Sequence, residues 1–187
     1  QILKQNTAQD GKTVELIAEH DGYRQIGVIH RRSVISDLTG KWLIEDQLLP
    51  DETEGFQSGQ KDKNMGSSST DKRTYRARLH WLLPDWSWEL DETEDNYQIS
   101  IRLRSPQGWI VLQIGIEPAT QEDNAQQPIL QLVRAGESLL DSDPVSPTSG
   151  WVSPTYGYKI PALSLAIVME SSLPIVFRSQ WDLPQYS

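Results

Sequence analysis

The 187-residue sequence contains no cysteine, and this absence excludes several structures and chemistries at once. Disulfide frameworks, zinc sites with cysteine ligands and thiol catalysis all need the side chain that is missing. Secretion is not excluded, because larger secreted domains can fold on a hydrophobic core without disulfides. We therefore expect a fold that is stabilised by its core alone.

Basic residues are in the minority, since 17 Lys and Arg stand against 26 Asp and Glu and the formal net charge is −9. Proteins that bind DNA or RNA neutralise phosphates with a basic surface, so a nucleic-acid partner is disfavoured. No apolar run approaches the ~18 residues of a spanning helix, and we expect no membrane partner. The first residues include neither an initiator methionine nor a signal peptide, which we interpret as a piece of a longer protein.

Helical periodicity is also missing, and alternation of apolar and polar residues takes its place. Within Arg73–Trp81, apolar side chains at odd positions alternate with arginine and histidine, and Tyr97–Arg104 repeats the pattern. Such alternation is typical of strands with one buried and one solvated face. The further strands that we predict are Thr13–Glu19, Tyr23–Ile29, Arg32–Ser36, Lys41–Glu45, Gly108–Ile116, Ile129–Arg134, Ala162–Glu170 and Ile175–Trp181.

Short links between these strands indicate the kind of sheet. Most links have two to eight residues, whereas a parallel crossover needs about a dozen or more. Asp37–Gly40 and Ser105–Gly108 are expected to close hairpins. We therefore predict an all-β fold with a single domain over residues 1–187, built as a β-sandwich of two antiparallel sheets, with a closed barrel as the lesser alternative.

One segment, residues 50–72, differs from the rest because it is polar, rich in serine and glycine and nearly free of apolar residues. Such a composition cannot bury enough surface to offset its ordering entropy, so we predict a long mobile surface loop. Its length exceeds the ~12–15 residues usual for a structureless loop, and a lid at the edge of a substrate site is the alternative.

Three histidines are available for chemistry. His20 opens the run His20-Asp21-Gly22-Tyr23, where Asp-Gly favours a tight turn, so His20 either flanks that turn or contacts a substrate. His30 precedes two arginines and is unusual for a core position; it is a candidate to ligate a metal, bind an anion or hydrogen-bond a buried carboxylate. His80 alternates with arginines and is most simply a residue of a solvated face.

The arginines predict a basic surface on this acidic protein. If Arg73–Trp81 and Tyr97–Arg104 pair as a hairpin around Trp86–Asp95, their even-numbered side chains share one face. That face is either a salt-bridged surface or a surface that binds an anionic partner. The residues of this expected stripe are Arg76, Arg78, His80, Arg102 and Arg104.

Catalytic motifs are not found. The sequence has no G-x-S-x-G, no phosphate-binding glycine loop and no H-E-x-x-H. The carboxylate-rich runs Asp51–Glu54 and Asp91–Asp95 look like solvated loops rather than the fixed acid/base pair of a glycosidase. The residues by themselves therefore predict a β-sandwich and no particular reaction.

Four segments, taken in order, resemble the β-sandwich domain of the heparinase II/III-like polysaccharide lyases. Residues 20–32 read HDGYRQIGVIHRR and are similar to the HDGY…HxR stretch of that family. Residues 41–46 (KWLIED), 78–84 (RLHWLLP) and 150–162 (GWVSPTYGYKIPA) resemble three later elements. The resemblance covers roughly residues 10–183, and the ordered set is more specific than any one motif.

The resemblance implies a reaction and a division of labour between domains. Such lyases join an N-terminal helical toroid to this sandwich and cleave uronic-acid-containing polysaccharides by β-elimination in the cleft between them. A base removes the C5 proton after the substrate carboxylate is neutralised, because a sugar C–H is otherwise too weak an acid. The catalytic residues of the family lie mostly on the toroid, so we expect none in this chain and no activity from it alone. The implied substrate-binding residues are His20, Tyr23, Arg31, Arg76 and Arg78.

Some relatives hold a structural zinc ion in the sandwich, and the resemblance maps His30 to a ligand position. No further ligand is evident, so we expect no cofactor for this chain itself and a possible structural zinc only in a longer protein. The implied partners are an anionic polysaccharide and the helical toroid of the same chain, and a lyase of this kind is expected to be periplasmic or secreted.

Two other functions are compatible with the pattern. The alternative is a non-catalytic carbohydrate-binding or docking module, with Trp86, Trp88, Trp151 and Tyr156 as stacking platforms. A sandwich from an unrelated hydrolase is a third candidate, which a complete catalytic triad in the structure would identify.

Overall fold

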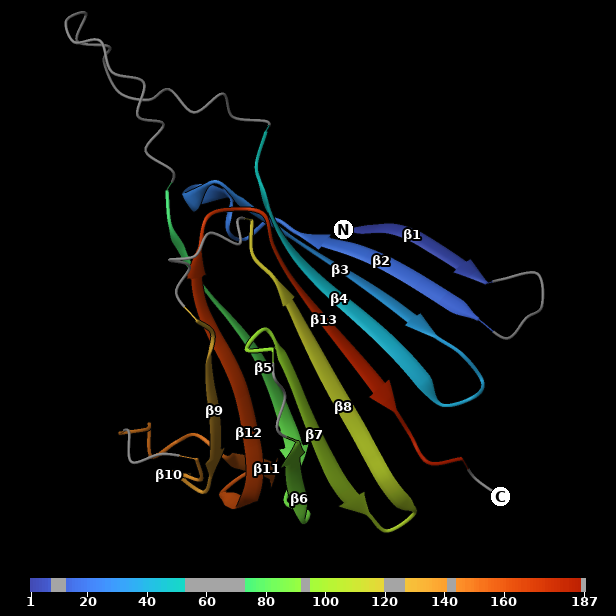
Figure 1. Ribbon diagram of the computed structural model, residues 1–187, viewed down its shortest axis with the longest axis vertical. Helices are drawn as coiled ribbons and strands as arrows, with labels where there is room; N and C mark the ends of the chain where they lie inside the picture. Colours follow the sequence, from blue (N-terminus) through green and yellow to red (C-terminus); the bar gives the residue numbers. More distant parts are fainter. Residues whose placement is uncertain (8–12, 53–72, 92–94, 120–126, 141–143, 186–187) are drawn as a thin grey trace, which may run out of the picture.

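A computed structural model describes residues 1–7, 13–52, 73–91, 95–119, 127–140 and 144–185, and its regular structure is almost entirely strand (Figure 1). The one short helix in these ranges is the 3₁₀ turn η1 (Arg24–Ile26), so the described residues contain no helix of the length and hydropathy needed to cross a membrane. The strands are β1 (Ile2–Thr7), β2 (Val14–His20), β3 (Val28–Ser36), β4 (Lys41–Pro50), β5 (Tyr75–Pro84), β6 (Trp88–Asp91), β7 (Gln98–Ser105), β8 (Gly108–Glu117), β9 (Ile129–Arg134), β10 (Glu137–Ser138), β11 (Trp151–Thr155), β12 (Tyr158–Ser171) and β13 (Ile175–Asp182).

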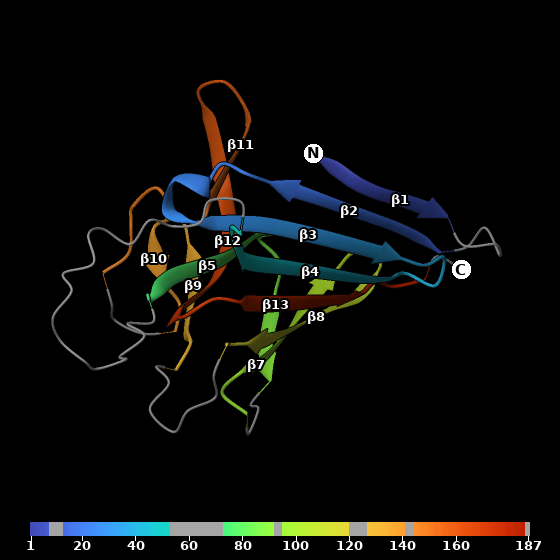
Figure 2. The same ribbon diagram turned by 90° about the horizontal axis from the view of Figure 1, so that it is seen from above.

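These strands form two antiparallel sheets, which confirms the predicted all-β sandwich. The larger sheet has the order β1-β2-β3-β4-β13-β8-β7-β6. The smaller sheet is centred on β12, which pairs with β9 on one side and β5 on the other, while β10 and β11 extend it. Figure 2 shows the hairpin of β11 and β12 projecting from the body of the molecule.

The core lies between β5, β9 and β12 of the smaller sheet and β13, β8 and β7 of the larger one. Leu165 and Ile167 of β12 face Leu112 and Ile114 of β8 in the same cluster, and all four are essentially buried. Alternation explains this composition, because every second residue of each strand points toward the facing sheet.

The smaller sheet covers only part of the larger one. No residue of β1, β2 or β3 belongs to the core cluster, and β4 contributes only Leu48 at its margin. These strands fan out beyond the smaller sheet in Figure 1. We refer to this part of the larger sheet, β1 to β4, as the β1–β4 extension.

Both predicted hairpins are confirmed. Asp37–Gly40 joins β3 to β4, and Asp37 Oδ1 accepts hydrogen bonds from the backbone N–H groups of Thr39 and Lys41. The Thr39 hydroxyl donates to the same oxygen and is the largest cause of the lowered pKa of Asp37. The two backbone N–H groups lower this pKa further. Ser105–Gly108 joins β7 to β8, and the Ser105 hydroxyl donates to the Gly108 carbonyl at 2.7 Å.

The predicted strand over Tyr23–Ile29 is wrong in its first half. The chain turns through η1 there, and Gly27 ends the turn at a φ of 76°, a left-handed conformation that favours glycine. Strand β3 begins only at Val28 and continues without a break through the predicted strand Arg32–Ser36. The sequence pattern also missed β1, β6, β10 and β11, while most of the predicted loop 50–72 lies outside the described residues.

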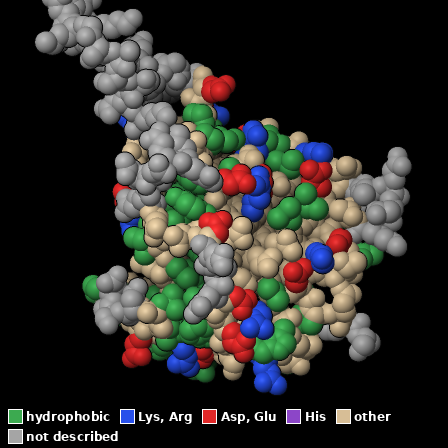
Figure 3. Space-filling view, viewed as in Figure 1, with side chains coloured by type: hydrophobic (Ala, Val, Ile, Leu, Met, Phe, Trp, Pro, Cys, Tyr) green, Lys and Arg blue, Asp and Glu red, His purple; other side chains and the backbone are tan. Residues whose placement is uncertain are grey.

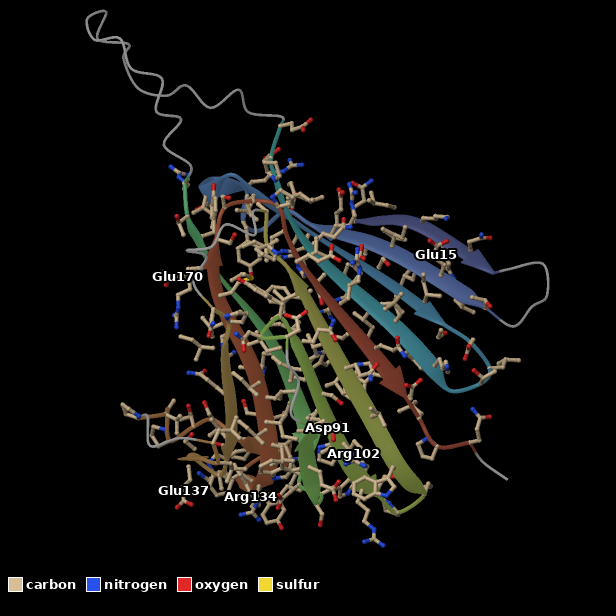
Figure 4. All side chains as sticks on the ribbon, in the orientation of Figure 1. Glu15, Asp91, Arg102, Arg134, Glu137 and Glu170 are labelled. Atoms are coloured by element: carbon tan, nitrogen blue, oxygen red, sulfur yellow. The ribbon has the colours of Figure 1, made fainter. Side chains whose placement is uncertain are left out.

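The expected arginine stripe is also wrong, because its two strands belong to different sheets. β5 pairs with β12, whereas β7 pairs with β6 and β8. Arg102 instead bonds to Asp91 at 3.1 Å and to Glu89 at 2.8 Å (Figure 4). The short strand β6 occupies the position beside β7 that the hairpin hypothesis gave to β5.

The central strand β12 should dominate stability. Leu165 is 1% exposed and packs between the sheets, so we expect Leu165→Ala to reduce the free energy of unfolding by about 2–5 kcal/mol. Leu38→Ala is the control, since Leu38 is 73% exposed in a turn and the change should cost less than ~0.5 kcal/mol. Urea unfolding of both variants measures the difference, and equal losses would contradict this account of the core.

Candidate functional site

A cleft of about 450 Å³ opens between the β1–β4 extension and strand β5. Strands β3 and β4 form one wall, the first half of β5 forms the other, and η1 with its flanking residues lies at the mouth. We call it the β3–β5 cleft. Its lining residues are Tyr23, Ile26, Val28, His30, Arg32, Asp46, Leu48, Tyr75, Arg76, Ala77, Arg78, Leu79, His80, Leu173 and Phe177.

Strand alternation decides which residues of β3 reach the cleft. Val28, His30 and Arg32 point inward, and Arg31 between them points to the opposite face of the sheet. There Arg31 donates two hydrogen bonds, of 2.8 and 2.6 Å, to Glu19 Oε1. Arg31 is therefore outside the cleft.

Asp46 is the polar centre of this wall and is only 4% exposed. Arg32 donates to both of its carboxylate oxygens, at 2.7 and 3.0 Å, and His30 Nε2 lies 2.7 Å from Oδ1. The carboxylate accepts both contacts on Oδ1, so His30 Nε2 carries the hydrogen. Burial by itself raises the pKa of Asp46, but the hydrogen bonds and the charge of Arg32 outweigh it and hold the pKa below its usual value.

Two tryptophans pack beside Arg32, next to the cleft and outside its lining. The Arg32 guanidinium lies 5.8 Å from the centre of the Trp81 ring, and Trp81 meets Trp181 edge to face at 5.3 Å. Trp81 also donates its indole N–H to the buried Ser179 hydroxyl at 3.2 Å. These contacts hold β5 against β13 and place Arg32 beside the Trp81 ring.

The β5 wall carries the positive charge of the cleft. Arg76 lies 3.9 Å from Glu170, a loose and exposed pair, and Arg78 makes no ion pair with any residue that the structure describes. The lining as a whole contains three arginines and one aspartate. The cleft is therefore locally basic on a protein whose net charge is −9.

At the mouth, a hydrogen bond joins β5 to η1, and a local aromatic contact supports Tyr23. The Tyr75 hydroxyl donates to the Ile26 carbonyl at 3.3 Å, which links β5 to η1. His20 packs edge to face against Tyr23 at 5.6 Å, and the Gly22 N–H donates to His20 Nδ1 at 3.3 Å. His20 therefore supports Tyr23 from outside the lining of the cleft.

His80 borders the cleft and also contacts the neighbouring strand β12. Its Nε2 lies 2.8 Å from the Ser164 hydroxyl of β12. Burial, reinforced by the positive charge of Arg78, lowers the pKa of His80. No carboxylate among the described residues hydrogen-bonds to His80, so the pair does not form a Ser-His-Asp triad.

Of the residues implied as substrate-binding, the cleft brings together Tyr23, Arg76 and Arg78, and it does not include His20 or Arg31. His30 lies in the cleft and bonds a buried carboxylate, which was one of its three interpretations. Sequence reasoning missed Arg32 and Asp46. Both occupy inward positions of strands that carry several other polar side chains, so polarity alone did not single them out.

The residues around His30 do not fit a zinc site. Among the described ranges, no group of three or more His, Asp or Glu side chains lies close enough together to hold a metal ion. Asp46, the one carboxylate at His30, is already bonded on both oxygens by Arg32. Zinc prefers about four such ligands, and a guanidinium beside the carboxylate opposes a cation.

The aromatic residues considered as sugar-stacking platforms differ in their accessibility. Trp86 and Trp88 are partly buried against the core cluster. The Lys159 ammonium covers the Trp151 ring at 3.9 Å, and only Tyr156, at the tip of the β11–β12 hairpin, is fully exposed. A flat row of aromatic rings is therefore not formed.

The fold and the cleft together define a two-sheet antiparallel domain with a basic cleft at the open side of the sandwich. The family model described as Heparinase II/III-like, C-terminal matches residues 2–180, and the chain belongs to this family. The family resemblance noted in the sequence is thereby confirmed. A comparison with curated protein sequences finds no significant match.

Solved structures share the fold at low sequence identity. A heparan sulfate lyase HepC from Pedobacter heparinus has a TM-score of 0.56 and 14% identity, over 100% of this chain and 22% of that chain. A structure of Heparinase III has a TM-score of 0.58 and 10% identity, over 100% and 21%. A Heparinase III-BT4657 gene product has a TM-score of 0.52 and 11% identity, over 94% and 20%. The chain thus spans about a fifth of the length of these proteins.

The charge at Asp46 should be visible as pH-dependent stability. Because the pKa of Asp46 is lower in the folded protein than its ordinary value of 3.8, its charge stabilises the fold above about pH 4, and this contribution is lost as the pH falls through the lower folded pKa. We expect Asp46→Asn to lower the free energy of unfolding by about 1–3 kcal/mol at neutral pH. Urea unfolding should show that this difference from the unmodified protein narrows steadily below about pH 4.

Glu89→Gln serves as the matched control for this measurement. Glu89 pairs with Arg102 at the surface, so its loss should cost less than ~1 kcal/mol. A loss at Asp46→Asn that is as small as the control, or that stays constant with pH, would contradict the role given to Asp46.

Proposed function

We propose that this chain is the C-terminal β-sandwich domain of a polysaccharide lyase, and that the β3–β5 cleft receives an acidic sugar unit. Membership of the heparinase II/III-like family supports the general function. The observation that carries the site is the basic cleft, where Arg78 has no ion pair within the described residues and Arg76 has only a loose one. Such guanidinium groups fit the carboxylate or sulfate of a uronic-acid polysaccharide.

The chemistry of β-elimination explains why such a cleft is useful. The C5 proton of a uronic acid becomes removable when the adjacent carboxylate is neutralised by cationic or hydrogen-bonding groups. Arg76 and Arg78 lie on one strand with exposed side chains and supply positive charge at the mouth. Arg32 is less available, because Asp46 already holds its guanidinium. Arg32 and Asp46 therefore shape the wall, and the β5 arginines bind.

The acid and base of the reaction lie outside this chain in our proposal. Asp46 is buried in an ion pair, and His80 bonds only the Ser164 hydroxyl among the described residues. The remaining part of the catalytic site is proposed to come from an N-terminal helical toroid of the same polypeptide. Isolated, the 187-residue chain should bind acidic oligosaccharide weakly and cleave none.

Incubation of the chain with heparan sulfate or alginate tests this division of labour. We expect no rise in the ultraviolet absorbance of unsaturated uronate, since the residues that the structure describes assemble no acid and base pair. A clear rise that scales with enzyme concentration would show that the chain contains its own catalytic groups and would overturn the proposal.

Substitution of the β5 arginines tests the binding site. Arg76→Gln and Arg78→Gln should each weaken binding of a heparan sulfate oligosaccharide by about three- to tenfold, because each removes one exposed charge-assisted contact. Titration calorimetry at low and physiological salt measures the effect, which should shrink as salt is added.

Arg104→Gln is the matched control, since Arg104 is an exposed arginine on the other sheet. Its affinity should equal that of the unmodified chain. Equal loss in all three variants would indicate nonspecific attraction to surface charge, and binding confined to a Tyr156→Ala-sensitive contact would favour the carbohydrate-binding module instead.

A further inference from the structure

The inner face of the β1–β4 extension is the same surface that forms the core farther along the larger sheet. Directly paired residues of neighbouring antiparallel strands point to one side of the sheet. The strand register therefore places Leu16, Val34, Ile44, Ser179 and Ile114 in a single row on this face. Ser179 and Ile114 are buried under the smaller sheet, whereas the first three are only partly buried.

Exposure rises outward along this face until large apolar side chains are open to solvent. Val14 and Trp42 are each 41% exposed, in the row next to that of Leu16 and Val34. Beyond Arg32 and Asp46, the inner face has no charged residue on β2, β3 or β4. The uncharged residues there are Val14, Leu16, Val34, Ser36, Trp42 and Ile44. Such a surface offers an acidic polysaccharide no charge and fits an apolar protein layer.

Strand β5 has an open edge beside this face. Among the described residues it pairs with β12 alone, so its other edge presents unpaired backbone groups over ten residues. That edge faces the extension, because the cleft joins β5 to β3 and β4 and because Trp81 of β5 meets Trp181 of β13. An open edge is a template for another strand. Figure 3 shows that charged side chains of both signs are interspersed with apolar ones on the face seen there.

We infer that a β-segment of the same polypeptide, lying outside these 187 residues, continues the smaller sheet past β5 and covers the inner face of the β1–β4 extension. A single segment accounts for both the open edge of β5 and the apolar inner face. Its backbone pairs with the second half of β5, and its alternate side chains contact Leu16, Val34 and Ile44. The solved relatives have chains about five times as long as this one, so such proteins contain the necessary polypeptide.

This surface is separate from the proposed saccharide site. The saccharide site lies at the beginning of β5, with Tyr23, Arg76 and Arg78. The rows of Leu16, Val34 and Ile44 that the added segment would cover lie toward the end of β5. The inference does not depend on the proposed function, and it assigns to a strand, rather than to a helical domain, the contact with this part of the sheet.

The test compares the 187-residue chain with the natural polypeptide that contains it. Hydrogen exchange should be at least about tenfold slower in the longer polypeptide at the backbone amides of β5 from Trp81 to Leu83. The inner-face variants Leu16→Thr and Val34→Thr should lower the Tm of the longer polypeptide by about 4 °C or more and leave that of the 187-residue chain nearly unchanged.

Ile17→Thr and Ile35→Thr are the matched controls, because they lie on the same strands and point to the outer face. Each should shift the Tm equally in both proteins. Equal shifts for the inner-face variants, or unchanged exchange of β5, would overturn the inference. So would a dimer of the 187-residue chain in sedimentation that Val34→Asp dissociates, or a natural polypeptide with no residues beyond these.

Discussion

Burial of one face of the larger sheet is the constraint on which the structure depends. The strands β5, β12 and β9 cover that face over β13, β8 and β7, and the hydrophobic core forms only there. Beyond the edge of the smaller sheet, the same face of the larger sheet becomes polar around Asp46. This residue is buried and bonded by Arg32 and His30. The cleft is thus the boundary between the covered and uncovered parts of one sheet. Its polar network satisfies a charge that would otherwise be costly to bury.

The sequence pattern predicted strands and their buried faces better than their partners. Ile129–Arg134 matches β9, and the hairpins at Asp37 and Ser105 were found because their turns are local. The pairing of β5 with β12 brings residues about 90 positions apart into contact, and alternation contains no information on which strand lies beside which. The false hairpin between β5 and β7 came from this limit. It placed Arg76 and Arg102 on one face, although they belong to different sheets.

The candidate site was predicted in the same uneven way. Tyr23, Arg76 and Arg78 do meet in the cleft, since η1 and β5 are joined through the Tyr75 hydroxyl. Arg31 lies outside the cleft because β3 runs unbroken through residues 30–32 and turns the Arg31 side chain to the opposite face from His30, whereas the sequence pattern had placed both residues between two strands. Asp46 was missed for a different reason. The predicted strand ended at Glu45, and only the three-dimensional pairing of β3 with β4 shows that Asp46 points inward and has Arg32 as its partner.

The positions of β12 and β13 along the chain have a consequence for biosynthesis. These two strands, within residues 158–182, are central members of the smaller and the larger sheet respectively. Strand β5, made much earlier, finds its one described partner only when β12 emerges from the ribosome, and β4, already paired with β3, then gains β13 on its other side. Until then the apolar side chains that will form the core are exposed, and long-range strand pairing of this kind folds slowly and favours aggregation of incomplete chains.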